Sequence, residues 1–383
     1  MVWPYIILSY FSLFVFGLCD NVRGPLFTEI LKAFHLGDAQ GAWFFALSSA
    51  AGFITSFFSR HLFRYFSKTL VIRGATLSMM LSLWGLAWSP NFYFFLVFIF
   101  IFGLSMGLLG LVPNILVNLG TPVKHRRQVL SGLHSMYGMA SLLAPLFVAG
   151  IAWQGGNWRD AFRWVSLSPL SLLIYSFFVP VQPLVEEKHP RTAGESVTRG
   201  FRLHAPQIFL AAMMSFYVMA EILISSRLAL YMTRVRHFDF EMSSVYVTYF
   251  FVCLLAGRLF FSFVKFAAPL RRQLSFSLLL SISLMLAGIY INPLFFVIAG
   301  LSMAPFYPLT VALISEEFPR DLDSALSYLI GSDSLMLIVM HLLVGSLTDV
   351  YGIAQAMLVG PAVLLLSFVM LNSFSHIFKK RAG

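Results

Sequence analysis

Charged residues are scarce in this 383-residue chain, because Asp, Glu, Lys and Arg make up only 11% of it while 59% is hydrophobic. Soluble globular proteins carry about a quarter charged residues and slightly under half apolar residues. A soluble fold is therefore excluded. Cysteine is almost absent, and Cys19 and Cys253 both fall inside apolar runs. We accordingly expect no disulfide and no cysteine metal site.

Motifs for enzymatic chemistry are also missing. The sequence has no glycine-rich phosphate loop, no HExxH and no CxxC, so we expect neither an enzyme nor a bound metal or cofactor. Without a nucleotide site, any pumping must use an ion gradient or the gradient of the solute itself. The net charge of +10 fits anionic lipid headgroups better than nucleic acid, because its basic residues cluster in loops and the tail.

Long apolar runs dominate what is present. A helix needs about 20 residues to cross a bilayer, and the runs predict twelve such helices in an all-α integral membrane protein. The first six are expected near 4–27, 40–59, 70–89, 92–118, 128–152 and 162–181, and the second six near 207–231, 243–264, 273–291, 294–315, 324–347 and 353–376. The polar stretch 182–206 is predicted to be a cytoplasmic linker between two six-helix bundles, 1–181 and 207–383.

The basic residues predict the orientation in the membrane. With the amino terminus inside, 19 of the 26 Lys and Arg residues fall on the inner side, Arg258 among them. Positive charge concentrates on cytoplasmic loops. We therefore expect both termini in the cytoplasm and the protein in the plasma (inner) membrane, as a monomer.

Two short repeats relate the halves. The string GLSM occurs at Gly103 and again at Gly300, and Leu130-Ser131-x-Leu133 matches Leu326-Ser327-x-Leu329 at nearly the same offset. Repeats about an axis along the membrane normal are one way in which transporters are built. The offset is close to half the chain, which favours a duplicated six-helix unit.

Two stretches carry further motifs, YVMAEILISSRLALYM from Tyr217 and GLSMAPFYPL from Gly300. Both resemble motifs of the major facilitator superfamily, and in particular of its branch of fucose and glucose/galactose proton symporters. Asp20 stands where the fucose symporters have an acidic residue associated with proton coupling. The resemblance implies two six-helix bundles that expose a central site alternately to either side. Departures include Phe63, where the superfamily usually has Asp, and Arg227, where the branch usually has Trp.

Three acids inside predicted spans are the candidate proton carriers: Asp20, Glu221 and Asp333. Charged groups in a bilayer are costly and usually face a bundle interior or a water-filled cavity. Glu221 has no basic residue three or four positions away, so burial favours its protonated form. The structural alternative is that protonated Glu221 only bonds a neighbouring helix. His134 and His341 are further titratable candidates, although a histidine in an apolar helix is more often a packing residue.

Arginine positions leave several alternatives open. Arg23 lies three residues after Asp20, on the same helical face, so the two either neutralise each other or tune a proton site. Arg227 faces either the first span and Asp20, or an anionic solute, or the outer rim.

Polar and aromatic residues supply candidate solute contacts. Pro305 and Pro308 are expected to disrupt the tenth helix where it lines a cavity. The full set of candidate substrate-binding residues is Arg23, Asn21, Asn114, Asn118, Tyr137, Arg227, Phe306 and Tyr307.

These features predict a secondary active transporter, with proton-coupled symport of a small polar solute such as a sugar as the leading version. Export of an amphiphilic or anionic compound is the alternative within transport, since Arg23 and Arg227 are not required by a neutral hexose. A non-transporting membrane receptor on the same fold is a further alternative, and a membrane-embedded enzyme has the least support.

Overall fold

Sixteen helices form the part of the chain that the computed structural model describes, residues 1–181, 205–264, 267–318 and 322–378. The amino-terminal half contains α1 (Trp3–Asn21), α2 (Arg23–Phe34), α3 (Asp38–Tyr65), α4 (Lys68–Trp88), α5 (Phe92–Gly120), α6 (Val123–Trp153), α7 (Trp158–Val165) and α8 (Leu167–Phe177). The carboxy-terminal half contains α9 (Ala205–Arg236), α10 (Phe240–Phe263), α11 (Leu270–Tyr290), α12 (Leu294–Met303), α13 (Phe306–Glu317), α14 (Leu322–Tyr351), α15 (Ile353–Ala356) and α16 (Val359–Phe378).

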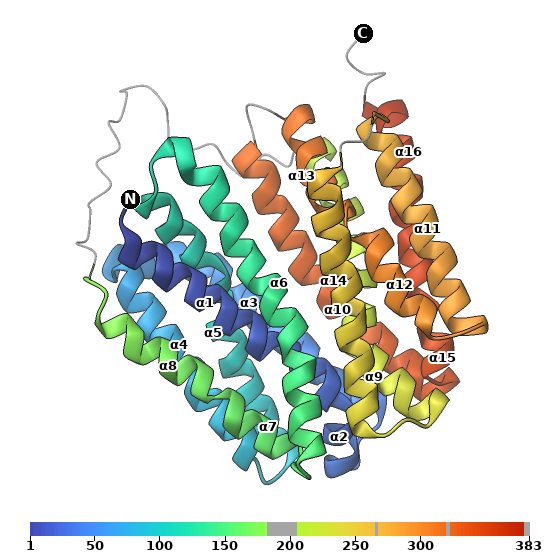
Figure 1. Cartoon of the computed structure of the whole chain (residues 1–383), viewed down its shortest axis with the longest axis horizontal. Coiled ribbons are helices and arrows are strands. Elements are labelled where there is room, and N and C mark those ends of the chain that lie inside the picture. Colours follow the sequence, from blue (N-terminus) through green and yellow to red (C-terminus); the bar gives the residue numbers. More distant parts are fainter. Residues whose placement is uncertain (182–204, 265–266, 319–321, 379–383) are drawn as a thin grey trace.

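Four membrane spans are interrupted helices, so the sixteen helices make twelve spans in two bundles of six, as predicted. The interrupted spans are α1–α2, α7–α8, α12–α13 and α15–α16. Within the described residues, ten segments are long and apolar enough to cross a bilayer by composition alone. The other two, α3 and α7–α8, complete the bundle because α3 packs on α5 and α8 packs on α4 and α1. Figure 1 shows the amino-terminal half in blue to green on the left and the carboxy-terminal half in yellow to red on the right.

Several span boundaries differ from the prediction by four to seven residues, those of the first and sixth spans among them. The first span continues to Phe34 and is interrupted at Val22, between α1 and α2. Gly24 and Pro25 do not form this break, because they lie in the first turn of α2, where a proline is tolerated. The sixth span begins earlier than expected, because Asn157 and Asp160 form a capping box that starts α7. Most of the predicted linker, 182–204, lies outside the described residues.

The repeated glycines perform the same packing task in each half. Gly103 brings α5 against α3, where an added Cβ would overlap the carbonyl oxygen of Ser48. Gly300 brings α12 against α10, where an added Cβ would lie 2.6 Å from the carbonyl oxygen of Phe250. Small residues let membrane helices approach closely. The internal repeat in the sequence therefore corresponds to equivalent helix contacts.

The halves contact each other mainly through three helix pairs: α2 with α9, α3 with α14, and α6 with α10. Figure 1 shows α6, α10 and α14 along the junction. We call the end of the molecule formed by the loop after α2 and by the ends of α9 and α14 the distal end, because it lies opposite the start of α1 and α9.

Candidate functional site

Glu221 is half-buried on α9 and is bound by two side chains. Its Oε1 atom lies 3.3 Å from Nη2 of Arg258 on α10, and its Oε2 atom lies 2.6 Å from the hydroxyl of Tyr217, one turn earlier on α9. The sequence placed Arg258 on the inner side and gave Glu221 no basic neighbour on its own helix. The partner comes from another helix instead, since Arg258 lies within α10, more than one turn before its end at Phe263.

The tenth span is broken next to this carboxylate, as the two prolines predicted. α12 ends at Met303 and α13 begins at Phe306. The break leaves the carbonyl oxygen of Met303 available, and the Tyr217 hydroxyl lies 2.7 Å from it. Phe306 is fully buried and stacks on the Tyr217 ring at 4.3 Å between centroids. Tyr307 is 40% exposed, so of these two neighbouring aromatic candidates only Tyr307 is open to a solute here.

Asp333 joins the same region from α14. Its Oδ1 atom accepts a hydrogen bond from the Ser215 hydroxyl at 2.7 Å. Tyr307 lies within electrostatic reach of Asp333, Glu221 and Arg258. We refer to Tyr217, Glu221, Arg258, Tyr307 and Asp333 as the C-half polar cluster.

A second cluster lies in the amino-terminal half. Asp20 forms an ion pair with Arg23, as their spacing indicated, and Tyr137 on α6 donates a hydrogen bond to Asp20 Oδ2 at 2.7 Å. Arg23 also donates to the Ser48 hydroxyl on α3 at 2.6 Å. We call Asp20, Arg23, Ser48 and Tyr137 the N-half polar cluster. Its carboxylate is thus held by partners from two helices.

The asparagines predicted to contact the solute do not lie together in one cluster. Asn21 donates to the Gly17 carbonyl and to the Ser141 hydroxyl at 3.0 Å, which places it beside the N-half polar cluster. Asn114 donates to the Gly110 carbonyl of its own helix, and Asn118 is half-buried one turn further along α5. The amide nitrogens of Asn21 and Asn114 are therefore engaged within the protein.

Arg227 is buried between the halves, with a relative exposure of 1%. Its guanidinium carbon lies 4.2 Å from the Phe27 ring centroid and 4.6 Å from that of Phe45, so it faces the first span but not Asp20. Among the described residues no acceptor bonds either Nη atom. His341 stacks on the same Phe45 ring at 4.7 Å and is also buried, whereas His134 is exposed on α6.

Polar contacts join the two halves at the distal end. Asp349, in the last turn of α14, accepts hydrogen bonds from the backbone amides of Asp38 and Ala39 at 2.6 and 2.9 Å, and so caps the start of α3. The Asp38 carboxylate pairs with Arg234 of α9 at 2.5 Å. We call Asp38, Arg234 and Asp349 the distal latch. Nothing in the sequence suggested it, because its members lie more than 100 positions apart.

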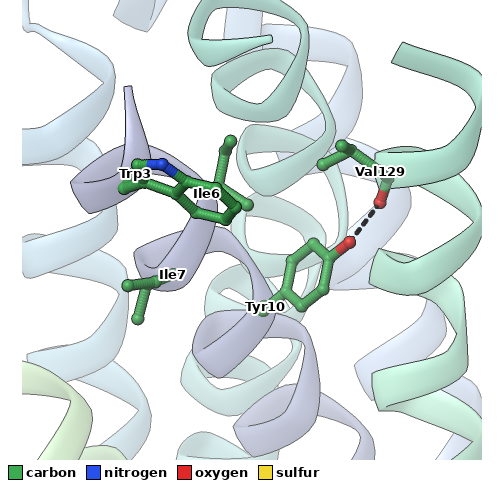
Figure 2. A pocket seen from close by; sticks show the side chains of 5 residues that line it. All are labelled: Trp3, Ile6, Ile7, Tyr10 and Val129. Atoms are coloured by element: carbon green, nitrogen blue, oxygen red, sulfur yellow. Dashed lines mark hydrogen bonds between the residues drawn. The ribbon is translucent and has the colours of Figure 1, made fainter. Parts of the chain in front are cut away.

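A groove of about 390 Å³ lies elsewhere, between α1 and α6, and is drawn in Figure 2. It is lined by Trp3, Ile6, Ile7, Tyr10 and Val129. The Tyr10 hydroxyl is engaged, because it donates to the Val129 carbonyl at 2.7 Å. The groove offers no charged group for a polar solute and does not belong to either polar cluster.

Serines and one tyrosine complete both clusters without having been singled out from the sequence. Ser48 accepts a hydrogen bond from Arg23 and Ser141 accepts one from Asn21, whereas Ser215 donates to Asp333 and Tyr217 donates to Glu221. Tyr217 had a readable signal, since it lies one helical turn from Glu221. The serines had none, because similar serines occur throughout the spans.

The fold and the buried ionisable groups define a class: integral membrane proteins of twelve helices in two related halves with polar groups between the helices. The sequence model of the Major Facilitator Superfamily matches residues 9–320, and the chain belongs to that superfamily.

The chain is also similar to individual proteins, in sequence or in fold. The chain is 21% identical to "Protein TsgA homolog" of Buchnera aphidicola subsp. Baizongia pistaciae, over 98% of this chain and 96% of the relative. Its fold is similar to the inward-facing, unoccupied structure of a bacterial homologue of the human lysosomal transporter Spinster, with a TM-score of 0.79, 14% identity and coverage of 98% and 97%. It is also similar to a D-xylose-proton symporter, with a TM-score of 0.77, 16% identity and coverage of 97% and 98%.

Proposed function

We propose that the protein is a secondary active transporter that works by alternating access and moves a small polar solute, such as a sugar, together with protons. In this proposal Glu221 and Asp20 carry protons, and Asp333 is a subsidiary carrier. The solute contacts in this proposal are Asn21, Arg23, Asn114, Asn118, Tyr137, Arg227 and Tyr307, whereas the predicted contact Phe306 is buried and supports the Tyr217 ring by stacking on it. The distal end corresponds to the outer face, which is closed in this conformation.

The single observation that supports proton coupling is the position of the Tyr217 hydroxyl. It lies within hydrogen-bond distance of both Glu221 Oε2 and the Met303 carbonyl oxygen. A hydroxyl carries one proton, and a carbonyl can only accept. When Glu221 is ionised, Tyr217 donates to it and the Met303 carbonyl loses this bond. When Glu221 is protonated, Glu221 donates to Tyr217, and Tyr217 donates to Met303.

Protonation of Glu221 therefore has two consequences in this proposal. It moves the Tyr217 hydrogen bond onto the break between α12 and α13, and it removes the charge that attracts Arg258. The first changes the support of a discontinuous helix, and the second weakens the contact between Glu221 and Arg258 that joins α9 to α10. Both act beside Tyr307, the exposed aromatic residue of the C-half polar cluster, so proton binding and solute binding share one region.

The test begins with identification of a solute. A thermal-shift screen of small solutes at two pH values reports binding and its proton linkage together. Uptake of the hit is then measured in proteoliposomes under an imposed pH gradient. We expect Glu221→Gln to abolish gradient-driven accumulation while solute exchange at equal pH continues.

Glu316→Gln is the matched control, because Glu316 is exposed near the end of α13 and we expect accumulation to be unchanged. Full gradient-driven accumulation by Glu221→Gln would refute the coupling role of this carboxyl group.

Export of an anionic or amphiphilic compound is the second candidate. It is favoured over uptake of a neutral hexose by the buried Arg227, whose Nη atoms have no acceptor in the part of the chain that the structure describes. Measuring flux in both directions across the same proteoliposomes separates the two. Net solute movement driven against the proton gradient supports export, and movement with the protons supports symport.

A further inference from the structure

Among the described residues, the guanidinium of Arg227 has neither an ion-pair partner nor a hydrogen-bond acceptor for its Nη atoms in this conformation. Its side chain is 1% exposed, and neither Nη1 nor Nη2 has a hydrogen-bond acceptor among the described residues. Two aromatic rings, those of Phe27 and Phe45, cover the guanidinium. Aromatic faces attract a cation but do not accept its N–H groups as an oxygen does. A buried guanidinium in this state is costly.

The nearest acids do not supply the missing acceptor. Three are bound to other arginines, in the pairs Asp20 with Arg23, Asp38 with Arg234, and Glu221 with Arg258, and Asp349 is bound to two backbone amides. Asp38 attracts Arg227 electrostatically, but it forms no ion pair or hydrogen bond with it. The buried guanidinium of Arg227 therefore pairs with no residue in the described part of the protein. Its hydrogen-bond acceptor would then belong to a bound molecule.

The surroundings of Arg227 form only when the halves meet at the distal end. Phe27 belongs to α2 and Phe45 to α3, whereas Arg227 belongs to α9 of the other half. Gly24, one turn before Phe27, packs against the backbone of Ser225, two residues before Arg227. Separation of α2 from α9 would expose the guanidinium on the face between the halves, along which a solute passes in alternating access.

We propose that Arg227 binds an acidic group of the solute, so that the protein carries a small organic anion and not a neutral sugar. The inference deepens the proposed function and rests on it. A carboxylate matches the planar guanidinium fork with two parallel hydrogen bonds. Closure of the distal end then buries a paired charge. In the protein without solute, the same closure buries the Arg227 charge without a partner and is therefore disfavoured.

A cysteine at Ser225 reports this closure. Ser225→Cys is made after Cys19→Ser and Cys253→Ser, the only two cysteines of the chain. The residue lies at the contact of α2 and α9, so we expect it to react with a membrane-impermeant maleimide when the distal end opens. The probes are matched pairs that differ in an acidic group: glucuronate with glucose, acetate with acetamide, and benzoate with benzamide. Labelling is measured at one pH without a proton gradient.

We expect at least one carboxylate to slow labelling about fivefold or more, and its neutral partner to leave the rate unchanged. Arg227→Leu should remove this protection and should also slow labelling of the empty protein, because closure no longer buries an unpaired charge. Arg227→Gln keeps a polar side chain and replaces Arg227→Leu if the latter does not fold. Arg236→Leu, at an exposed position of the same helix, should behave as the unsubstituted protein.

Three outcomes overturn the inference: no carboxylate acts beyond its neutral partner, the protection survives Arg227→Leu, or the cysteine of the empty protein does not react. None of these results depends on Glu221. The anion site can therefore fail while proton coupling stands, and proton coupling can fail while the anion site stands.

Discussion

Tyr217 connects the C-half polar cluster at the scale of single residues. Its ring stacks on Phe306, and its hydroxyl lies between a carboxylate on its own helix and a freed carbonyl on the broken span. The ring contact and the hydroxyl contacts are separable, because phenylalanine keeps one and loses the other. The residue therefore allows the proton-linked hydrogen bond to be tested without loss of packing.

We expect Tyr217→Phe to weaken gradient-driven uptake strongly and to destabilise the protein by only about 1 kcal/mol, the usual contribution of one hydrogen bond. Uptake in proteoliposomes and the thermal unfolding midpoint measure the two effects. Tyr231→Phe is the matched control. Tyr231 is equally buried, but its hydroxyl is 3.4 and 3.5 Å from its two carbonyl neighbours, so little is lost. Equal uptake by both variants would contradict the role assigned to Tyr217.

Close helix approach at the repeated glycines determines the architecture at the scale of elements. Gly103 and Gly300 lie where two helix backbones meet in the corresponding place of each half, and neither site has room for a Cβ. A methyl group there forces the helix backbones apart. Packing therefore accounts for the two repeated glycines, whichever solute the protein binds.

Gly103→Ala and Gly300→Ala are each expected to lower stability by about 1 to 3 kcal/mol, as overpacking of a tight contact does. Gly74→Ala is the control. Gly74 lies within α4, and an added Cβ there meets no atom within 4 Å. Alanine is the better helix former by about 1 kcal/mol, so this variant should unfold at a slightly higher temperature. Thermal unfolding of the three purified variants measures these effects. A Gly300→Ala variant that is more stable than the unsubstituted protein would show that the contact between α12 and α10 is not tight.

At the scale of the whole molecule, interactions of opposite effect at the distal end set the balance between its open and closed conformations. The distal latch favours closure, because Asp349 caps α3 from the other half and Asp38 pairs with Arg234. A carboxylate at a helix start also interacts favourably with the helix dipole. Arg227 opposes closure while it lacks an acceptor. A protein that must both open and close benefits when one interaction favours closure and another opposes it.

Asp349→Asn should therefore open the distal end, since it removes the charge and one of two accepting oxygens. We expect the Ser225→Cys reporter to label about fivefold faster or more in this variant. Asp239→Asn provides the control, because Asp239 caps α10 within its own half by accepting from the Met242 amide at 2.8 Å. Loss of that cap should change stability slightly and leave the labelling rate unaltered. An unchanged rate in Asp349→Asn would mean that the latch does not hold the halves together.

The sequence by itself determined the twelve spans, the two related halves, the broken tenth helix and the Asp20–Arg23 pair. Each depends on local composition or spacing: apolar length, repeated small residues, two prolines, and a separation of three along one helix. The tertiary structure decided the partners of Glu221, the burial of Arg227 and the distal latch. Those contacts join different helices, and the side chains that meet there depend on how the helices pack and on which end of the bundle is closed.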